Sequence, residues 1–190
     1  MIYRGGTGRI KAALLAVLTA GLGAAWPAAA EIGPADTLTL GVTGEVQQRC
    51  GFKTPPAASL SIGVLDQAGS AVLPLMVDCN TGFHVRMTSA NGSLAAQQPS
   101  AMFGNRLDYE VRFQVGTDAG PMEAACAASA LKYGGCALYG PTAGSGGLSS
   151  GDAVAIDETG ALTIDWAAPS EVLTAGAWSD TLTIVLEARS

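Results

Sequence analysis

The stretch from Asp36 to Cys50 alternates between apolar and polar side chains along its length. Leu38, Leu40, Val42 and Val46 share one parity, with Gly44 between them, and Thr, Glu, Gln and Arg fill most of the other. A period of two residues predicts a β-strand with one apolar and one solvated face. Because the strand lies near the start of the chain, it is placed to leave its own domain and enter another.

Residues 1–30 have the pattern of a secretory signal peptide. Arg4, Arg9 and Lys11 precede the apolar run 12–25, and residues 28–30 are three alanines that suit cleavage before Glu31. The apolar run is too short to favour the alternative of a membrane anchor. We therefore expect an exported protein that is soluble or assembled outside the cytoplasm.

The composition predicts a folded domain built from strands. The chain of 190 residues is 48% hydrophobic and only 14% charged, which argues against disorder. Its 25 glycines, together with many Thr, Ser and Val residues, favour short strands joined by turns. The net charge of −6 without a basic stripe argues against a nucleic-acid partner.

The apolar alternation predicts about seven short strands and no long helix. Beyond the first stretch, the strands are expected at residues 60–64, 71–79, 83–88, 106–115, 154–156, 162–166 and 178–188. Residues 116–151 are rich in Ala and Gly, and we expect a surface excursion with a short helical turn within 121–131. This order predicts an all-β, immunoglobulin-like antiparallel sandwich over residues 48–190, preceded by an extension, residues 31–47.

The four cysteines of an exported chain are expected to form two disulfides, for which three pairings are possible. We favour Cys50–Cys79, which would join adjacent strands, and Cys126–Cys136, which would close a small loop. A zinc site is disfavoured because the chain has no C-x-x-C pair and only one histidine, His84.

The sequence offers no convincing catalytic or cofactor site. His84 has Ser89 and Asp78 nearby in sequence, but no nucleophile elbow frames them. The glycine-rich run 144–147 is not followed by Lys-Ser/Thr, so a phosphate-binding loop is not expected. The acidic residues between 152 and 165 do not have the spacing of an EF-hand. We therefore expect no enzymatic activity, no metal and no cofactor.

Three stretches, in this order, resemble the subunits of chaperone–usher fimbriae. They are Gly-Glu-Val with a cysteine four residues later (44–50), Val-Asp-Cys-Asn-Thr-Gly-Phe (77–83) with Ser-Ala-Asn-Gly (89–92), and Ala-Gly-Ala-Trp-Ser-Asp-Thr-Leu-Thr-Ile (175–184). The last stretch is similar to the spore coat protein U-like branch of this family. The likeness covers residues 36–116 and 152–190, whereas the final residues 187–190 lack the penultimate Tyr of classical pilins, and the Cys126–Cys136 loop is not a general feature of the family.

The resemblance implies a sandwich that lacks its seventh strand. A periplasmic chaperone would fill the gap first, and after passage to an outer-membrane usher the extension of a neighbouring pilin subunit would replace it. Leu38, Leu40 and Val42 would then be the inserted side chains, with Gly44 allowing close approach. Trp178, Leu182, Ile184 and Leu186 of the last strand would form the receiving edge.

Two other interpretations stay open at this point. Residues 36–47 could form the first strand of a closed, self-sufficient sandwich. The chain could also be a secreted or tip-located adhesin that binds carbohydrate, with Trp166, Trp178 and Tyr139 lining the surface. Core packing is the favoured role for the two tryptophans.

Overall fold

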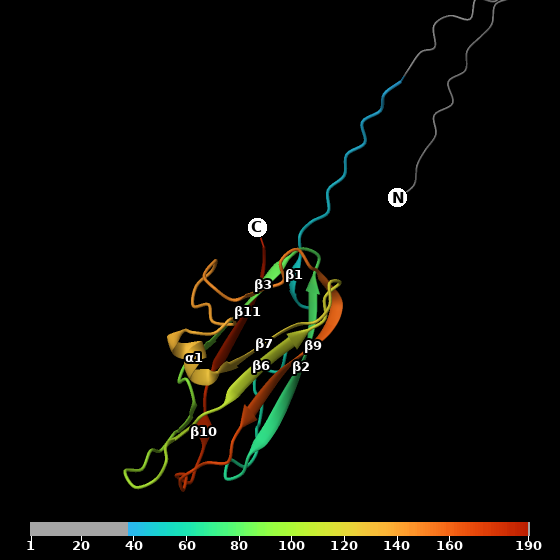
Figure 1. Ribbon diagram of the computed structural model, residues 1–190. Helices are drawn as coiled ribbons and strands as arrows, with labels where there is room; N and C mark the ends of the chain where they lie inside the picture. Colours follow the sequence, from blue (N-terminus) through green and yellow to red (C-terminus); the bar gives the residue numbers. More distant parts are fainter. Residues whose placement is uncertain (1–37, 190) are drawn as a thin grey trace, which may run out of the picture. The chain divides into compact units, whose positions relative to one another are not determined.

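The computed structural model describes residues 38–189 (Figure 1). The expected signal peptide, residues 1–30, and residues 31–37 of the extension lie outside the described part. The chain divides into two units, Met1–Thr43 and Gly44–Ser190, and the fold described below is that of the second unit.

The domain consists of antiparallel sheets whose strands alternate between a buried and a solvated face. The largest sheet has five strands in the order β1-β2-β9-β6-β7, which are β1 (Cys50–Phe52), β2 (Gly69–Cys79), β9 (Ala155–Trp166), β6 (Glu110–Val115) and β7 (Met122–Ala127). Two three-stranded sheets accompany it, namely β11 (Leu182–Ala188), β3 (Phe83–Ser89) and β8 (Leu148–Ser149), and β10 (Trp178–Ser179), β4 (Leu94–Ala96) and β5 (Arg106–Leu107). One short helix, α1 (Ala128–Tyr133), follows β7 (Figure 1).

Side chains from all three sheets meet in one core. Val111 and Phe113 of β6 are fully buried, while their neighbours Arg112 and Gln114 are exposed. Phe83, Val85 and Met87 of β3 are equally buried. Burial of this apolar surface is the main force that holds the sheets together. The predicted all-β, antiparallel, sandwich-like fold is therefore confirmed.

Two of the predicted strands are each divided between sheets. The expected strand 106–115 is split into β5 and β6, and the expected strand 178–188 is split into β10 and β11. In both cases two residues separate the pieces, Asp108-Tyr109 and Asp180-Thr181. The chain changes sheets at these points, so a continuous ladder cannot form.

Both disulfides that the sequence favours are present. Cys50–Cys79 links β1 to β2 at a position where the two residues face each other in the ladder. Cys126–Cys136 ties the end of β7 to the segment after α1. Two disulfides indicate an oxidising, exported environment. Across residues 38–189, none of the helical structure is both long and apolar enough to cross a membrane.

The β2–β9 ladder contains a bulge close to this disulfide. Val77 faces Glu158 and Cys79 faces Ala155, so Ile156 and Asp157 lie opposite the single residue Asp78. Asp157 adopts a left-handed conformation with φ of 54°. Asp and Asn tolerate this region better than β-branched residues do.

We expect Asp157→Val to lower the free energy of unfolding by about 1–2 kcal/mol because a β-branched side chain is strained at positive φ. Asp157→Gly should have a smaller effect, since glycine adopts this conformation freely. Urea unfolding of the two variants measures the difference. Lys53→Met is the control, because it removes the exposed 2.6 Å ion pair with Asp157 without changing the backbone. Equal losses in Asp157→Val and Asp157→Gly would contradict the strain argument.

Candidate functional site

An apolar groove lies beside the first half of β11 (Leu182–Ala188). It has a volume of about 1580 Å³. One wall is the last strand with Leu182 and Ile184, and the other is the segment from 56 to 66 between β1 and β2. Between the walls lie core side chains of the large sheet and its neighbours: Leu73, Leu94, Tyr109, Leu162 and Ile164. The site is thus an exposed part of the hydrophobic core.

The β11 wall presents unpaired backbone groups to the groove. β11 is an edge strand that pairs with β3 on one side. The Thr181 carbonyl accepts a hydrogen bond from Ala90, and the Arg189 N–H donates one to the Gly82 carbonyl, so the odd-numbered residues point their backbone groups toward β3. By alternation, the N–H and C=O groups of Leu182, Ile184 and Leu186 point away from β3, to the free edge. Such an edge is a template for another strand.

The opposite wall has unpaired backbone groups too. Within residues 38–189, no backbone hydrogen bond involves residues 54–66. Pro55 and Pro56 lack N–H groups, and they begin the segment. The strand that the sequence predicts at residues 60–64 is therefore not formed, although Ile62 and Leu65 pack against the core. A strand needs a ladder partner, and here the groove occupies the partner's place.

β1 lies at one end of the groove. β1 lies beside β11 as well as beside β2, and Phe52 of β1 lines the groove. At the other end the walls are the turn 63–66 and the connection 169–177. We call these the closed end and the open end; Figure 1 shows β1 at the first and β10 toward the second.

Asp180 fixes the start of β11 at the groove. One carboxylate oxygen accepts hydrogen bonds from the Ser89 hydroxyl at 2.5 Å and the Tyr109 hydroxyl at 2.6 Å. The other accepts from the backbone N–H groups of Asn91 at 2.8 Å and Thr181 at 2.7 Å. Burial of Tyr109, and then its bond to this carboxylate, raise the pKa of the tyrosine above its ordinary value. The cluster holds the break between β10 and β11 against the end of β3.

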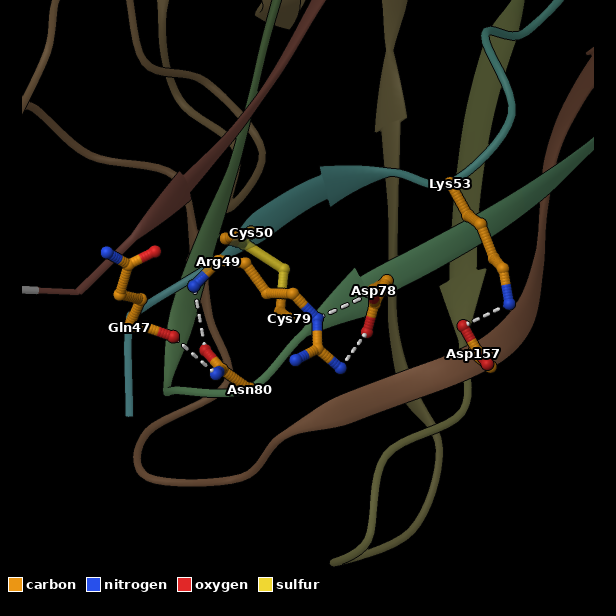
Figure 2. Close-up of polar contacts among 8 residues, drawn as sticks. All are labelled: Gln47, Arg49, Cys50, Lys53, Asp78, Cys79, Asn80 and Asp157. Atoms are coloured by element: carbon orange, nitrogen blue, oxygen red, sulfur yellow. Dashed lines mark hydrogen bonds and ion pairs between the residues drawn. A yellow bond between two sulfur atoms is a disulfide. The ribbon is translucent and has the colours of Figure 1, made fainter. Parts of the chain in front are cut away.

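At the closed end, polar contacts clamp the chain as it enters the domain (Figure 2). The Asn80 side chain accepts from the Arg49 N–H and donates to the Gln47 carbonyl, both at 2.8 Å. The Arg49 guanidinium donates to both oxygens of Asp78, at 2.8 and 3.1 Å. This bond lowers the pKa of Asp78 below its ordinary value. We call these four residues the clamp; from Gln47 onward the chain is bound to β2 and the turn after it.

The extension exposes its apolar side chains. Leu38, Leu40 and Val42 are 91%, 78% and 85% exposed, and Val46 is 82% exposed. Residues 38–49 form no strand, so the predicted strand 36–50 is present only as β1, which begins at Cys50. Residues 36–37 lie outside the described part. An isolated strand has no ladder partner and does not form by itself.

The structure places most of the predicted receiving residues at the groove. Trp178, Leu182 and Ile184 line it, whereas Leu186 does not. Trp178 lies on β10, whose backbone pairs with β4, so it contributes a side chain but no free edge. Tyr109, Asp180 and the wall at 56–66 were not identified from the sequence. The only sequence signal for Asp180 is a polar Asp-Thr pair that interrupts an apolar strand.

The other candidate residues do not gather into a site. Ser89 is bonded to Asp180, and Asp78 is bonded to Arg49, so neither is a partner of His84. Trp166 is buried, and its indole N–H donates to the Gln67 carbonyl. Among residues 38–189, no three His, Cys, Asp or Glu side chains are grouped so as to hold a metal ion.

Comparison of the chain with protein-family models and with curated proteins finds no match in either case.

The clamp predicts a specific pH dependence. Since the pKa of Asp78 is lower in the folded state than its unfolded value of about 3.9, the pair stabilises the domain above that pH. This stabilisation is lost as the pH falls through the folded pKa. We expect Asp78→Asn to unfold more easily than the wild type at neutral pH, with a difference that shrinks as the pH falls below 4.

Urea unfolding at a series of pH values measures this effect. Arg49→Gln should remove the same pH-dependent component, and the double variant should show no further change, because both substitutions break one interaction. Parallel profiles for wild type and Asp78→Asn would contradict the prediction.

Proposed function

We propose that this protein is a structural subunit of an extracellular, fimbria-like fibre. The extension of one copy adds as a strand to the groove of the next, with Leu38, Leu40 and Val42 entering the core and Gly44 at a point of close approach. As the family resemblance implies, a periplasmic chaperone occupies the groove first, and an outer-membrane usher receives the subunit. The neighbouring subunit then takes the chaperone's place.

One observation carries this proposal: an apolar groove lies between two walls whose backbone groups facing it are unpaired. A small apolar ligand would cover the core side chains but leave these N–H and C=O groups without partners. A β-strand satisfies both needs, since it supplies a ladder on its edges and side chains on one face. The groove therefore favours a peptide strand as its occupant.

The extension has the properties that such an occupant needs. Its apolar side chains recur every second residue and are exposed in the free chain. Burying three Leu or Val side chains stabilises the joint by roughly 5–9 kcal/mol before the costs of ordering and association. The chain thus carries both halves of a head-to-tail contact, and a heterologous contact of this kind forms open filaments.

The alternative of a carbohydrate-binding adhesin has less support at this groove. Sugar recognition needs free polar groups that point into the site. Here Tyr109 and Asp180 are bonded to each other, and the Trp178 indole N–H donates to the Thr174 carbonyl at 3.0 Å. The lining that remains includes the polar side chains of Asp66 and Glu171, but most of its residues are aliphatic.

Two complementary variants of the full exported chain test strand donation. Leu40→Asp places a charge on the inserted face of the extension and leaves the groove intact; we call it the donor-blocked chain. Ile184→Asp places a charge in the groove and leaves the extension intact; we call it the groove-blocked chain. We expect each alone to be monomeric, because a buried unpaired charge is strongly unfavourable. Mixed at equal concentrations, they should form a heterodimer and no longer species, as measured by size-exclusion chromatography with light scattering.

The controls are Thr39→Asp, which has the opposite parity to Leu40 in the extension, and Gln114→Asp, at an exposed position of β6 that does not line the groove. Both should assemble like the wild type. Circular dichroism and thermal melting verify that Ile184→Asp is folded. The proposal fails if the two blocked chains polymerise separately, or if folded blocked chains do not combine.

Hydrogen exchange tests the second wall. Amides of residues 54–66 lack backbone partners in the free chain and should exchange quickly. A synthetic peptide of residues 36–47, added to the donor-blocked chain, should slow amide exchange in part of this segment by tenfold or more, because a ladder forms. The same peptide with Leu40→Asp is the control. Exchange that is equally fast with both peptides would show that the segment does not pair with an inserted strand.

A further inference from the structure

Three exposed apolar side chains lie together at the open end of the groove. Met102 and Phe103 are 85% and 48% exposed, and Val172 is 71% exposed. Gly104 joins them, because its N–H donates to the Val172 carbonyl at 2.9 Å and its carbonyl accepts from Thr174 at 3.0 Å. We call Met102, Phe103 and Val172 the tip patch. Figure 1 shows the loop before β5 projecting at the end of the domain opposite β1.

The loop that carries the tip patch is held in place by hydrogen bonds. The Asn105 side chain accepts from the Ser100 N–H at 2.7 Å and donates to the Ser100 carbonyl at 2.6 Å. The Thr174 hydroxyl donates to the same side-chain oxygen of Asn105 at 2.8 Å. At Gly104 a Cβ atom would lie 2.7 Å from a carboxylate oxygen of Glu171, so glycine permits this close approach. The patch is therefore presented on a fixed loop.

One member of the tip patch, Val172, also lines the groove. Val172 and its neighbours 173–178 line the groove at the open end. Since β1 lies beside β11 at the other end, the donor's domain has room only beyond the open end, and the inserted strand is placed with its free N-terminus near β1 and its C-terminal end at the open end. It then runs antiparallel to β11, which begins at the open end with Leu182 and finishes beside β1.

The length of the extension determines where the donor's domain lies. Leu38 to Val46 is eight residue-to-residue steps, or about 26 Å, while Leu182 to Ala188 is six steps, or about 20 Å. With Leu38 near β1, Val46 therefore lies just beyond the start of β11, at the open end of the groove, which Val172 also lines. In the donor, the clamp begins at Gln47, one residue later. Four residues, 43–46, therefore lie between the last inserted side chain, Val42, and the donor's clamp.

We propose that the tip patch is a second contact between successive copies of this chain, formed with the clamp end of the donor and centred on the donor's Val46. The inference rests on the proposed strand donation and adds a residue-specific interface to it. Val46 has the same parity as Leu38, Leu40 and Val42 but lies outside the groove, so its exposed side chain needs a partner. Met102, Phe103 and Val172 supply an apolar surface at that position.

The test uses the heterodimer of donor-blocked and groove-blocked chains. Met102→Ser with Phe103→Ser is placed in the donor-blocked chain, whose groove receives the strand. We expect the dissociation rate of the heterodimer to rise by about tenfold or more, because the loss of an aromatic contact within an interface commonly has an effect of this size. The rate is measured by chasing a labelled heterodimer with excess unlabelled groove-blocked chain. Gln98→Ser, an exposed polar position in the same loop, is the matched control and should leave the rate unchanged.

A double-mutant cycle tests the contact itself. Val46→Ser in the groove-blocked chain and Phe103→Ser in the donor-blocked chain should each increase the dissociation rate of the heterodimer. The two substitutions together should increase this rate by less than the product of their separate effects. Multiplicative effects would overturn the assigned contact. A dissociation rate that the tip substitutions leave unchanged would also overturn it, and would assign the patch to another occupant, such as a membrane or a foreign protein.

A short peptide distinguishes a failure of the tip-patch contact from a failure of strand donation. A peptide of residues 36–44 fills the groove but lacks Val46, so its release from the donor-blocked chain should not change with the tip substitutions. Faster release of this peptide would mean that the substitutions distort the groove, and the interface assignment would fall. If no heterodimer forms even with an unaltered tip, the strand-donation proposal fails and the interface fails with it.

Discussion

The free edge of β11 is the constraint on which the rest of this structure depends. A strand in the middle of a sandwich normally has neighbours on both sides, but β11 has β3 on one side and the groove on the other. The domain holds this edge in place from several directions. Asp180 fixes its start, while near its end Glu187 pairs with the buried Arg86 at 2.9 Å and the Arg189 N–H bonds to the Gly82 carbonyl. An edge held this firmly is a preformed template for an incoming strand.

The two walls of the groove differ in their backbone hydrogen bonding, and this difference bears on the proposed insertion of a strand. β11 is bonded along its length to β3, so it sets the register of whatever pairs with it. The segment 54–66 has no backbone bonds within the described residues, and it is tied to the core through side chains such as Ile62 and Leu65. A wall of this kind can adjust to an inserted strand without breaking existing hydrogen bonds. In the proposed contact, β11 would set the register of the inserted strand and the segment 54–66 would adjust to it.

The sequence predicts the parts of this fold that depend on local pattern. Period-two alternation located most strands, and strand ends suggested the Cys50–Cys79 pair. Residues 121–131 were expected to be partly helical because of their alanines, but Met122–Ala127 pairs with β6 instead, and the helix begins only at Ala128. Pairing with a neighbouring strand overrides intrinsic propensity there. The Asp180 cluster could not be predicted, since its partners Ser89 and Tyr109 are 91 and 71 residues away in sequence.

The position of the clamp bears on the kind of polymer that strand donation would produce. A flexible linker between strand and body would let successive domains reorient freely, and it would lower the effective concentration of any second contact. Here Gln47 is already bonded to Asn80, and the disulfide at Cys50 follows three residues later. The clamp thus begins five residues after Val42, the last side chain that the proposed contact inserts. In a fibre built this way, the clamp of one domain and the groove of the next would set the geometry of each junction. Such a junction favours a stiff filament over a flexible one.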